Sequence, residues 1–253
     1  MTERFASYPS LAGRVVLVTG GAGGIGADMV RGFAANGALV AFLDIDEAAA
    51  KALTTECPGT LFLKCDMLDI PALKTAIASA AERLGPIRVL VNNAANDDRR
   101  KVQAVDPAYW DWSQAVNLKH QFFAAQAVQP YMKQLGGGSI INLSSIAWRF
   151  GADEMTAYVT AKSAVIGLTR ALARNFGPDN IRVNAIEPGA VITERQRKLW
   201  FPTEASIDAM LSKQLLLRML AGEDIARMAL FLASDDARAI TKQSFIVDAG
   251  LSA

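Results

Sequence analysis

The glycine-rich segment near the start of the chain restricts the possible folds more than any other feature of the sequence. Residues 14–19 form a short apolar run, rich in valine, which is typical of a strand buried on both faces. Five of the next seven residues are glycine, and residues 27–36 then have the apolar spacing of a helix that packs with one face. Such a turn directs free backbone N–H groups and the positive end of the helix dipole toward an anion. We therefore predict a diphosphate cradle here, in preference to a glycine-rich turn without a ligand.

Two spacings fit these glycines. Residues 21, 23 and 26 match the pattern G-x-G-x-x-G, whereas residues 19, 20, 24 and 26 match T-G-x-x-x-G-x-G. Both patterns place a helix N-terminus directly after the turn. The local spacing by itself leaves the choice between them open.

A second apolar run, residues 38–44, predicts another buried strand, and it ends on Asp44, 24 residues after Gly20. A carboxylate at this position can accept hydrogen bonds from the adenosine ribose of a dinucleotide. Asp46 and Glu47 follow, and no basic residue is near, so a 2′-phosphate would be repelled. We therefore predict NAD as the cofactor. The alternative is that Asp44 only caps the next helix.

The rest of the chain continues to alternate between strand and helix patterns. Apolar runs predict strands at residues 60–64, 87–91, 139–143, 181–186 and 244–247. Helices are predicted at residues 46–56, 69–84, 106–135, 155–176 and 222–234. No repeat or linker divides the 253 residues, so the pattern predicts a single doubly wound α/β domain over 1–253, a parallel sheet flanked by helices. Residues 194–213 are long for a connection within such a domain, and a substrate lid is the usual explanation.

Polar residues follow the predicted strands, at the edge where open α/β sheets bind ligands. Asp66 follows the strand at 60–64 and can meet an adenine edge, while Asn93 and Ala94 follow the strand at 87–91. Residues 96–100, with the sequence Asn-Asp-Asp-Arg-Arg, come next. Two interpretations of this cluster remain open, a solvated loop and a polar contact to a substrate.

The balance of charge excludes several classes of protein. Lys and Arg number 26 against 25 acidic residues, a net charge of +1, so no nucleic-acid-binding surface is indicated. Residues 1–10 contain no apolar signal core, and no apolar run approaches the length of a membrane span. We therefore expect a cytoplasmic protein without nucleic-acid or membrane partners.

Cysteine and histidine are too few for metal or hydrolase chemistry. Cys57 and Cys65 are the only cysteines, which suggests reduced thiols and no disulfide framework. His120 is the only histidine, so no Cys/His cluster offers a metal site and a Ser-His-Asp hydrolase is disfavoured. We interpret His120 itself as a structural residue in preference to a catalyst.

A dinucleotide cradle without a metal site favours hydride transfer, which requires a group that exchanges the hydroxyl proton. Tyr158 and Lys162 lie at i and i+4 on a predicted helix, so both project from one face. A free tyrosine, with a pKa near 10, is a poor base, but a nearby ammonium group favours the phenolate. Ser145 follows a strand and can hydrogen-bond the reacting oxygen, while Asn117 lies among apolar neighbours, where its amide must find partners.

Taken in order, these motifs resemble the short-chain dehydrogenase/reductase family over essentially the whole chain. The matching pieces are Thr19-Gly20-x-x-x-Gly24-x-Gly26, Asn92-Asn93-Ala94, Asn117, Ser145 thirteen residues before Tyr158, Lys162, and Pro188-Gly189 with Val191 and Thr193. The resemblance decides between the two glycine spacings in favour of the second. It also implies a seven-stranded sheet in the order 3-2-1-4-5-6-7.

The same resemblance implies the roles of individual residues. It implies a catalytic tetrad of Asn117, Ser145, Tyr158 and Lys162. Lys162 would also bind the nicotinamide ribose, and Asn117 would hold a proton-relay water. The implied NAD-binding residues are Gly20, Gly23, Gly24, Ile25, Gly26, Asp44, Asp66, Met67, Asn93, Ala94, Tyr158, Lys162, Pro188, Gly189, Val191 and Thr193. Family members are usually tetramers or dimers, so we expect a homotetramer or a dimer.

Within the family, residues 8–11, 92–99 and 112–120 resemble bacterial aldose 1-dehydrogenases of the D-xylose type. This likeness implies NAD-dependent oxidation of a cyclic aldose, a pentose or a hexose, at the anomeric hydroxyl to an aldonolactone. The predicted substrate contacts are Asn96, Asp97, Ser145, Trp148, Tyr158 and Glu187, and Trp200 is an alternative to Trp148 as a flat apolar face for the sugar.

Two departures from the family pattern are mild, namely Ala95 in place of a glycine and Glu187 in place of a small or apolar residue. Two other functions remain as alternatives. One is a reductase of a ketone or 3-oxoacyl substrate that uses NADPH or NADH. The other is a nucleotide-sensing protein without catalysis, which the presence of all four tetrad residues disfavours.

Overall fold

Seven strands form one parallel sheet. They are β1 (Val15–Thr19), β2 (Leu39–Asp44), β3 (Leu61–Lys64), β4 (Ile87–Asn92), β5 (Gly138–Leu143), β6 (Ile181–Pro188) and β7 (Ser244–Val247). Their order in the sheet is β3-β2-β1-β4-β5-β6-β7, which confirms the predicted fold class. The structure, a computed structural model, describes residues 5–252; the predicted domain also includes residues 1–4 and 253, which lie outside the described residues.

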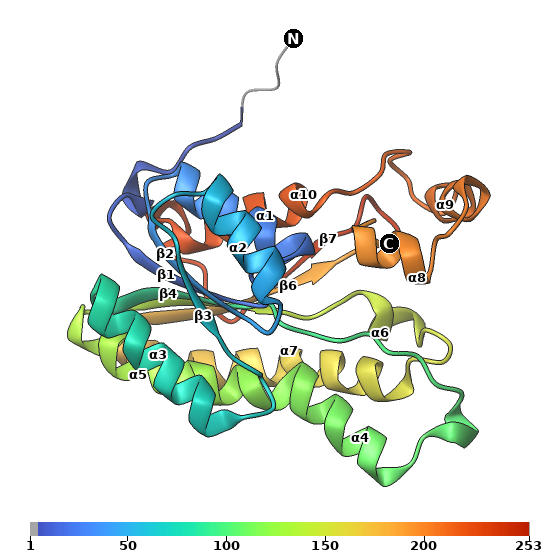
Figure 1. Cartoon of the computed structure of the whole chain (residues 1–253), viewed down its shortest axis with the longest axis horizontal. Coiled ribbons are helices and arrows are strands. Elements are labelled where there is room, and N and C mark those ends of the chain that lie inside the picture. Colours follow the sequence, from blue (N-terminus) through green and yellow to red (C-terminus); the bar gives the residue numbers. More distant parts are fainter. Residues whose placement is uncertain (1–4, 253) are drawn as a thin grey trace.

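Helices cover both faces of this sheet (Figure 1). They are α1 (Gly24–Ala35), α2 (Glu47–Glu56), α3 (Ile70–Leu84), α4 (Pro107–Gln114), α5 (His120–Gln134), α6 (Ala147–Phe150), α7 (Thr156–Phe176), α8 (Glu194–Leu199), α9 (Glu204–Leu211) and α10 (Gly222–Ala233). Helices α1, α2 and α10 lie on one face, and α3, α5 and α7 lie on the other. None of the helices within residues 5–252 combines the length and the apolar character that a membrane crossing requires.

Strand β1 explains why both faces are covered. All five of its residues are buried, and successive side chains point to opposite faces. Val16 and Val18 pack into the apolar cluster that contains α1 and α10, whereas Val15 and Leu17 pack into the cluster that contains α3 and α5. Each buried valine or leucine contributes about 1.5–3 kcal/mol, so this one run of residues stabilises both layers.

The register of the sheet brings the ends of the central strands to one level. Thr19 pairs with Asn92, Asn92 with Asn142, and Asn142 with Ala185. Strands β2 and β3 lie on one side of β1, and β4 to β7 lie on the other. The strand order therefore reverses between β1 and β4. Doubly wound sheets bind ligands in the crevice that opens at such a point.

The helical stretch predicted at residues 106–135 is not one regular helix. A π-helical turn, Ala115–Lys119, joins α4 to α5 and has Asn117 at its centre. Such a turn inserts one extra residue and changes the direction in which the following side chains point, and it occurs mostly at functional sites. The apolar pattern of the sequence did not indicate it.

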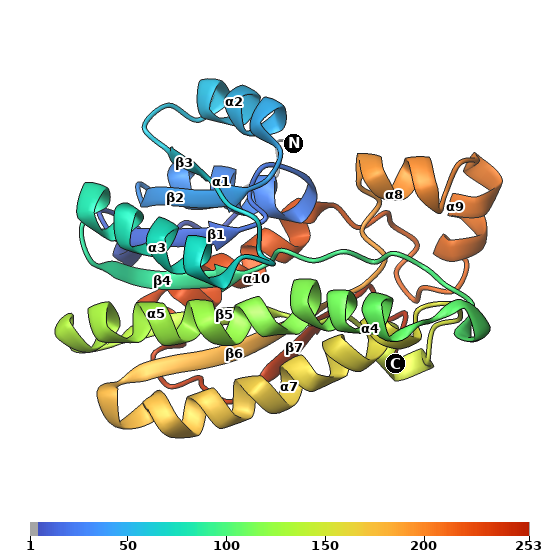
Figure 2. The ribbon, with the colours of Figure 1, turned by 60° about the horizontal axis from the view of Figure 1, so that its bottom comes forward.

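The predicted lid, residues 194–213, contains the two short helices α8 and α9. Figure 2 shows them together beyond the carboxyl edge of the sheet. The hydroxyl of Thr193 accepts the N–H of Gln196 at the start of α8, and Thr203 and Ser206 form a capping box at the start of α9. Local hydrogen bonds therefore account for where both helices begin.

The close packing at Gly26 gives a prediction about stability. A Cβ added at Gly26 would lie 1.9 Å from the carbonyl oxygen of Gly20 and 2.7 Å from Nδ2 of Asn93. Gly26→Ala should lower the free energy of unfolding by about 1–3 kcal/mol because the backbone must move. Urea denaturation followed by tryptophan fluorescence measures this change.

Gly23→Ala is the matched control. Its added Cβ meets no atom within 4 Å, and its φ of −147° is ordinary extended backbone. This variant should differ from the wild type by less than about 0.5 kcal/mol. Equal losses of stability in the two variants would contradict this account of the turn.

Candidate active site

A cleft of about 1010 Å³ lies at the carboxyl edge of the sheet, and residues of α8 line part of it. It combines residues that are far apart in the sequence, as expected at this edge. The predicted cofactor residues all line it, and they are Gly20, Gly23, Gly24, Ile25, Gly26, Asp44, Asp66, Met67, Asn93, Ala94, Tyr158, Lys162, Pro188, Gly189, Val191 and Thr193. No group of three or more metal-ligating side chains occurs among residues 5–252.

The glycine turn has the shape that a diphosphate group requires. A Cβ at Gly20 would lie 2.7 Å from Cα of Ala94, and Gly24 has a positive φ of 53°, which favours glycine. No side chain caps α1, because its N-cap is Gly23. The N–H groups in its first turn therefore keep their donors available for an anion. These features fit the diphosphate of a dinucleotide.

Asp44 lies at the other side of the same turn. Its Oδ2 accepts the N–H of Ala22 at 2.9 Å, and its Oδ1 accepts the N–H groups of Ile45 and Asp46 at 2.7 and 3.0 Å. The alternative role, capping of α2, belongs to Asp46, whose side chain accepts the N–H of Ala49. Asp44 therefore lines the cleft with its carboxylate held by backbone donors.

Tyr158 and Lys162 project from α7 into the cleft. Nζ of Lys162 lies 5.6 Å from the centre of the Tyr158 ring and donates to the carbonyl oxygen of Leu143 at 2.8 Å. Burial lowers the pKa of Lys162 to about 7, and the Asp97 carboxylate opposes this change. Burial raises the pKa of Tyr158 above its ordinary value and Asp97 raises it further, whereas the Ser145 hydroxyl lowers it. Positive charge near the phenol therefore decides whether Tyr158 can act as a base.

Ser145 and Asn117 reach the site from different elements. Ser145 follows β5, and its hydroxyl accepts the N–H of Ala147 at 3.1 Å. Asn117 does not line the cleft; its amide is fully buried beside it, and Nδ2 donates to the carbonyl oxygens of Asn96 and Ser113 at 2.9 and 3.0 Å. Of the predicted tetrad, three side chains thus line the cleft and the fourth side chain supports its wall.

The structure corrects the predicted substrate contacts of Glu187 and Trp148. Neither residue lines the cleft. Glu187 lies within β6 and is fully buried, where it accepts bonds from Arg149 at 2.8 Å, from the indole N–H of Trp148 at 2.9 Å and from the Ser244 hydroxyl. Trp148 lies on the short helix α6. The Glu187 carboxylate therefore anchors α6, the segment after Ser145, to β6 and β7.

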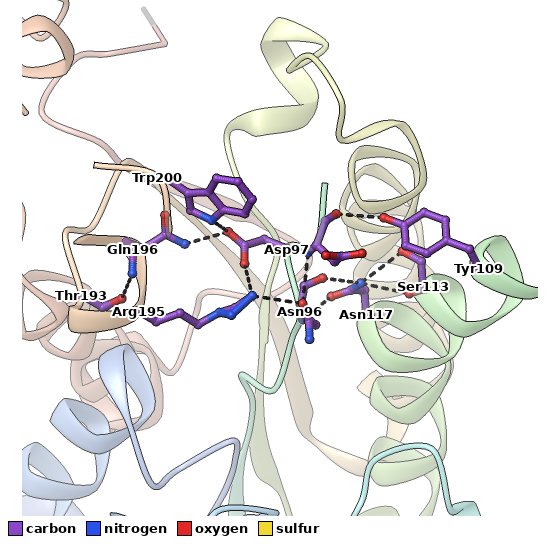
Figure 3. Close-up of polar contacts among 10 residues, drawn as sticks. Asn96, Asp97, Tyr109, Ser113, Asn117, Thr193, Arg195, Gln196 and Trp200 are labelled. Carbon is purple, nitrogen blue, oxygen red and sulfur yellow. Dashed lines mark hydrogen bonds and ion pairs between the residues drawn. The ribbon is translucent and has the colours of Figure 1, made fainter. Parts of the chain in front are cut away.

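The cluster at residues 96–100 is divided between the cleft and the solvent. Asn96, Asp97 and Arg99 line the cleft, whereas Asp98 and Arg100 line a separate shallow hollow with Tyr109. Asp97 is held by side chains of the lid, as Figure 3 shows. The Arg99 guanidinium lies 3.8 Å from the centre of the Trp200 ring and occupies one face of it.

The surroundings of His120 fit its interpretation from the sequence as a structural residue. It is fully buried, and its Nε2 lies 3.0 Å from the carbonyl oxygen of Ala94. Burial and the charge of Lys162 lower its pKa to about 3, so it stays neutral. It therefore holds the turn after β4 in place.

Some residues around the cleft could not be found from the sequence. Ala22 contributes a backbone N–H, which has no signature in the residue type. Arg195 and Gln196 line the cleft from α8, and only the length of the 194–213 segment pointed to their region. Contacts across the fold, and not local spacing, place them there.

A parallel sheet with a dinucleotide-sized cleft at its strand ends, into which a helix projects a tyrosine–lysine pair, is the arrangement of an NAD(P)-dependent oxidoreductase. A family model described as "Enoyl-(Acyl carrier protein) reductase" matches residues 20–252. A probable galactose dehydrogenase of Rhizobium meliloti is 49% identical, over 99% of this chain and 100% of that protein. The D-xylose 1-dehydrogenase of Caulobacter vibrioides is 45% identical, over 97% of this chain and 98% of that protein.

A solved structure also places the chain among dehydrogenases of this fold. The crystal structure assigned to a short-chain alcohol dehydrogenase from Sinorhizobium meliloti has a TM-score of 0.90 and 35% identity, over 96% of this chain and 98% of that one. The chain belongs to the short-chain dehydrogenase/reductase family. It is a dehydrogenase acting on CH–OH groups, and its family implies an NAD(P) cofactor.

The buried Glu187–Arg149 pair gives a prediction about pH and stability. Burial by itself would raise the pKa of Glu187, but hydrogen bonds from Arg149 and Ser244 hold it below the ordinary value. Arg149→Met leaves a buried carboxylate without its cation, so the free energy of unfolding at pH 7 should fall by up to about 3–5 kcal/mol. Urea denaturation over a range of pH measures this loss.

The loss should become smaller as the pH falls. In the variant the pKa of Glu187 rises above its unfolded value of about 4.3, so protonation in the folded state relieves the destabilisation. In the wild type the lowered pKa means that stability is present above pH 4.3 and disappears only below it. Arg170→Met, an exposed change on α7 that breaks no ion pair among residues 5–252, should cost less than about 0.5 kcal/mol. A loss that is independent of pH would contradict this interpretation.

Proposed function

We propose that this protein oxidises a cyclic aldose, a pentose or a hexose, at its anomeric C1 hydroxyl to an aldonolactone with NAD. The observation that carries the proposal is the polar wall of the cleft that also contains Tyr158 and Ser145. Asn96 and Arg99 line that wall, and Nε of Arg99 is buried without a partner among the described residues. Fixed donors and acceptors of this kind suit a ring of hydroxyl groups. The printed names of two relatives, a galactose dehydrogenase and a D-xylose 1-dehydrogenase, support the same substrate class.

The side chains of the chain account for the proton part of the reaction. Tyr158, as phenolate, accepts the proton of the anomeric hydroxyl, while the Ser145 hydroxyl donates a hydrogen bond to the same oxygen. The ammonium of Lys162 favours the phenolate, since it lies 5.6 Å from the ring centre. When bound, the oxidised nicotinamide supplies the acceptor for the hydride that leaves C1. A hemiacetal hydroxyl is more acidic than an ordinary alcohol, so a tyrosinate base suits this substrate.

Asp44 supports NAD as the cofactor over NADP. Its carboxylate lines the cleft at the end of β2, with Asp46 two residues further on. A carboxylate about 4 Å from a 2′-phosphate is repelled by up to about 4 kcal/mol per pair of charges at an effective dielectric of 20. The segment around Asp44 contributes no Lys or Arg to the cleft lining. The basic residues that line the cleft are Arg99, Lys162, Arg195 and Lys198.

Asp44→Ala should therefore reduce the preference for NAD. The ratio of kcat/KM with NAD to kcat/KM with NADP should fall by at least about ten-fold, which corresponds to about 1.4 kcal/mol of lost repulsion. Initial rates with each cofactor at a saturating aldose concentration measure the ratio. A wild-type enzyme that uses NADP as well as NAD would contradict this assignment.

A screen of aldoses with NAD tests the substrate. Purified enzyme is mixed with xylose, galactose and other pentoses and hexoses, and the absorbance of NADH is followed. We expect turnover with at least one of them, and steep losses with deoxy-sugars that lack a contacted hydroxyl, because polar groups of the site are then left unpaired. Tyr158→Phe is the control, and it should lower kcat about 10²–10⁴-fold while cofactor binding is retained.

The description of the matching family model favours a second candidate, reduction of an acyl-thioester or ketone substrate. That function predicts the opposite result. No aldose would yield NADH, and NADPH or NADH would be consumed with a 3-oxoacyl thioester. Such a result would overturn the proposed function.

A further inference from the structure

Asp97 is the centre of the contacts between the loop after β4 and the lid (Figure 3). Its carboxylate accepts hydrogen bonds from Arg195 at 2.9 Å, Gln196 at 2.7 Å and the indole N–H of Trp200 at 3.0 Å. All three donors belong to α8 or to the residue that ends it. The Asp97 side chain is only 14% exposed, and hydrogen bonds to a charged acceptor are stronger than neutral ones.

Neighbours of Asp97 in the loop hold the same lid residues. Oδ1 of Asn96 accepts a further hydrogen bond from Arg195 at 3.2 Å, and Arg99 stacks on Trp200. A helix of six residues such as α8 does not form on its own, because too few internal bonds offset the ordering of its backbone. Its position therefore depends on these contacts, together with the cap that Thr193 provides at the start of the helix.

The loop is also bonded to Asn117. The Asn96 N–H donates to Oδ1 of Asn117 at 2.9 Å, and Nδ2 of Asn117 donates to the carbonyl oxygen of Asn96 at 2.9 Å. The amide of Asn117 therefore pairs with the backbone of the residue before Asp97. A displacement of this loop would break both bonds.

We propose that Asp97 is a positioning residue that holds the lid over the substrate cleft and, through Asn96, keeps Asn117 in place. A carboxylate has room for about four hydrogen bonds, and the lid occupies three of them, so Asp97 acts on the substrate mainly through the lid. The proposal rests on the proposed function for the identity of the substrate. The contacts themselves do not depend on it.

Limited proteolysis tests the contact between Asp97 and the lid. Trypsin cleaves after Arg and Lys, and helix α8 of the lid offers Arg195, Arg197 and Lys198. Asp97→Asn keeps the size of the side chain but removes its charge. It also places an amide N–H donor next to the three groups of the lid that donate to Asp97. Cleavage at these three residues should become at least about ten-fold faster, because charge-assisted bonds that hold the lid are lost.

Asp98→Asn is the matched control. It makes the same chemical change one residue along, but the Asp98 side chain is 45% exposed and forms its ion pair with Arg100, away from the lid. Its cleavage rate should equal that of the wild type. Trp200→Phe, which retains a ring beneath Arg99 but lacks the indole N–H, should accelerate cleavage as Asp97→Asn does. This variant also tests the proposal if Asp97→Asn does not fold.

Kinetics test the consequence for the reaction. With an aldose that the enzyme accepts, Asp97→Asn should raise KM about ten-fold, while the Kd for NAD stays within about two-fold of the wild type. The effects of Asp97→Asn and Trp200→Phe should be less than additive in the double variant, because both remove the same contact. A variant that was merely destabilised would lose active enzyme without this change in KM.

The outcomes separate this proposal from the proposed function. Wild-type cleavage rates in both Asp97→Asn and Trp200→Phe would overturn it. A raised KM with unchanged cleavage would also overturn it, since Asp97 would then contact the sugar directly. If no aldose is oxidised, the proposed function fails, and the cleavage rates still decide whether Asp97 holds the lid.

Discussion

The parallel hydrogen-bond register between β1, β4 and β5 determines where the groups of the candidate site lie. It places Thr19, Asn92 and Asn142 in one row, so the turns that follow these strands leave the sheet side by side. The hydroxyl of Thr19 then accepts the N–H groups of Asn93 and Ala94 at 3.0 and 3.1 Å. In this way the glycine turn and the turn after β4 hold each other in place.

The candidate site also contains several buried polar side chains, and their burial costs free energy. Lys162 is almost fully buried and donates to a carbonyl oxygen of β5, and its pKa falls to about 7 as a result of its burial. Glu187 and Asn117 are fully buried, and each is paired with several donors or acceptors. Removal of one partner is therefore more damaging than removal of the whole pair, because it leaves a charge or an amide without compensation.

The lid connects the two halves of the cleft. Thr193, at the start of α8, packs close to Gly24 of the glycine turn, where a Cβ on Gly24 would lie 3.2 Å from the Thr193 methyl group. The other end of α8 is held by Asp97 and Arg99. One short helix thus links the glycine turn to the loop after β4.

The sequence by itself determined the features that depend on neighbouring residues. The glycine turn, the helix starts at residues 69 and 106, the i, i+4 placement of Tyr158 and Lys162, and the alternation of strands with helices all follow from local spacing. The seven-stranded order followed from the family resemblance, since local patterns do not fix which strands pair.

Only the tertiary structure decided which polar side chains face the cleft and which are bound by other parts of the protein. Glu187 meets Arg149 from a segment 38 residues away, and Asp97 meets Trp200 across 103 residues. The identity of a carboxylate is the same whether it faces water, a sugar or a buried arginine, so no local pattern separates these cases. The π-helical turn at Asn117 is a second example, because it packs against α7 and its Asn117 amide pairs with the backbone of Asn96, 21 residues away.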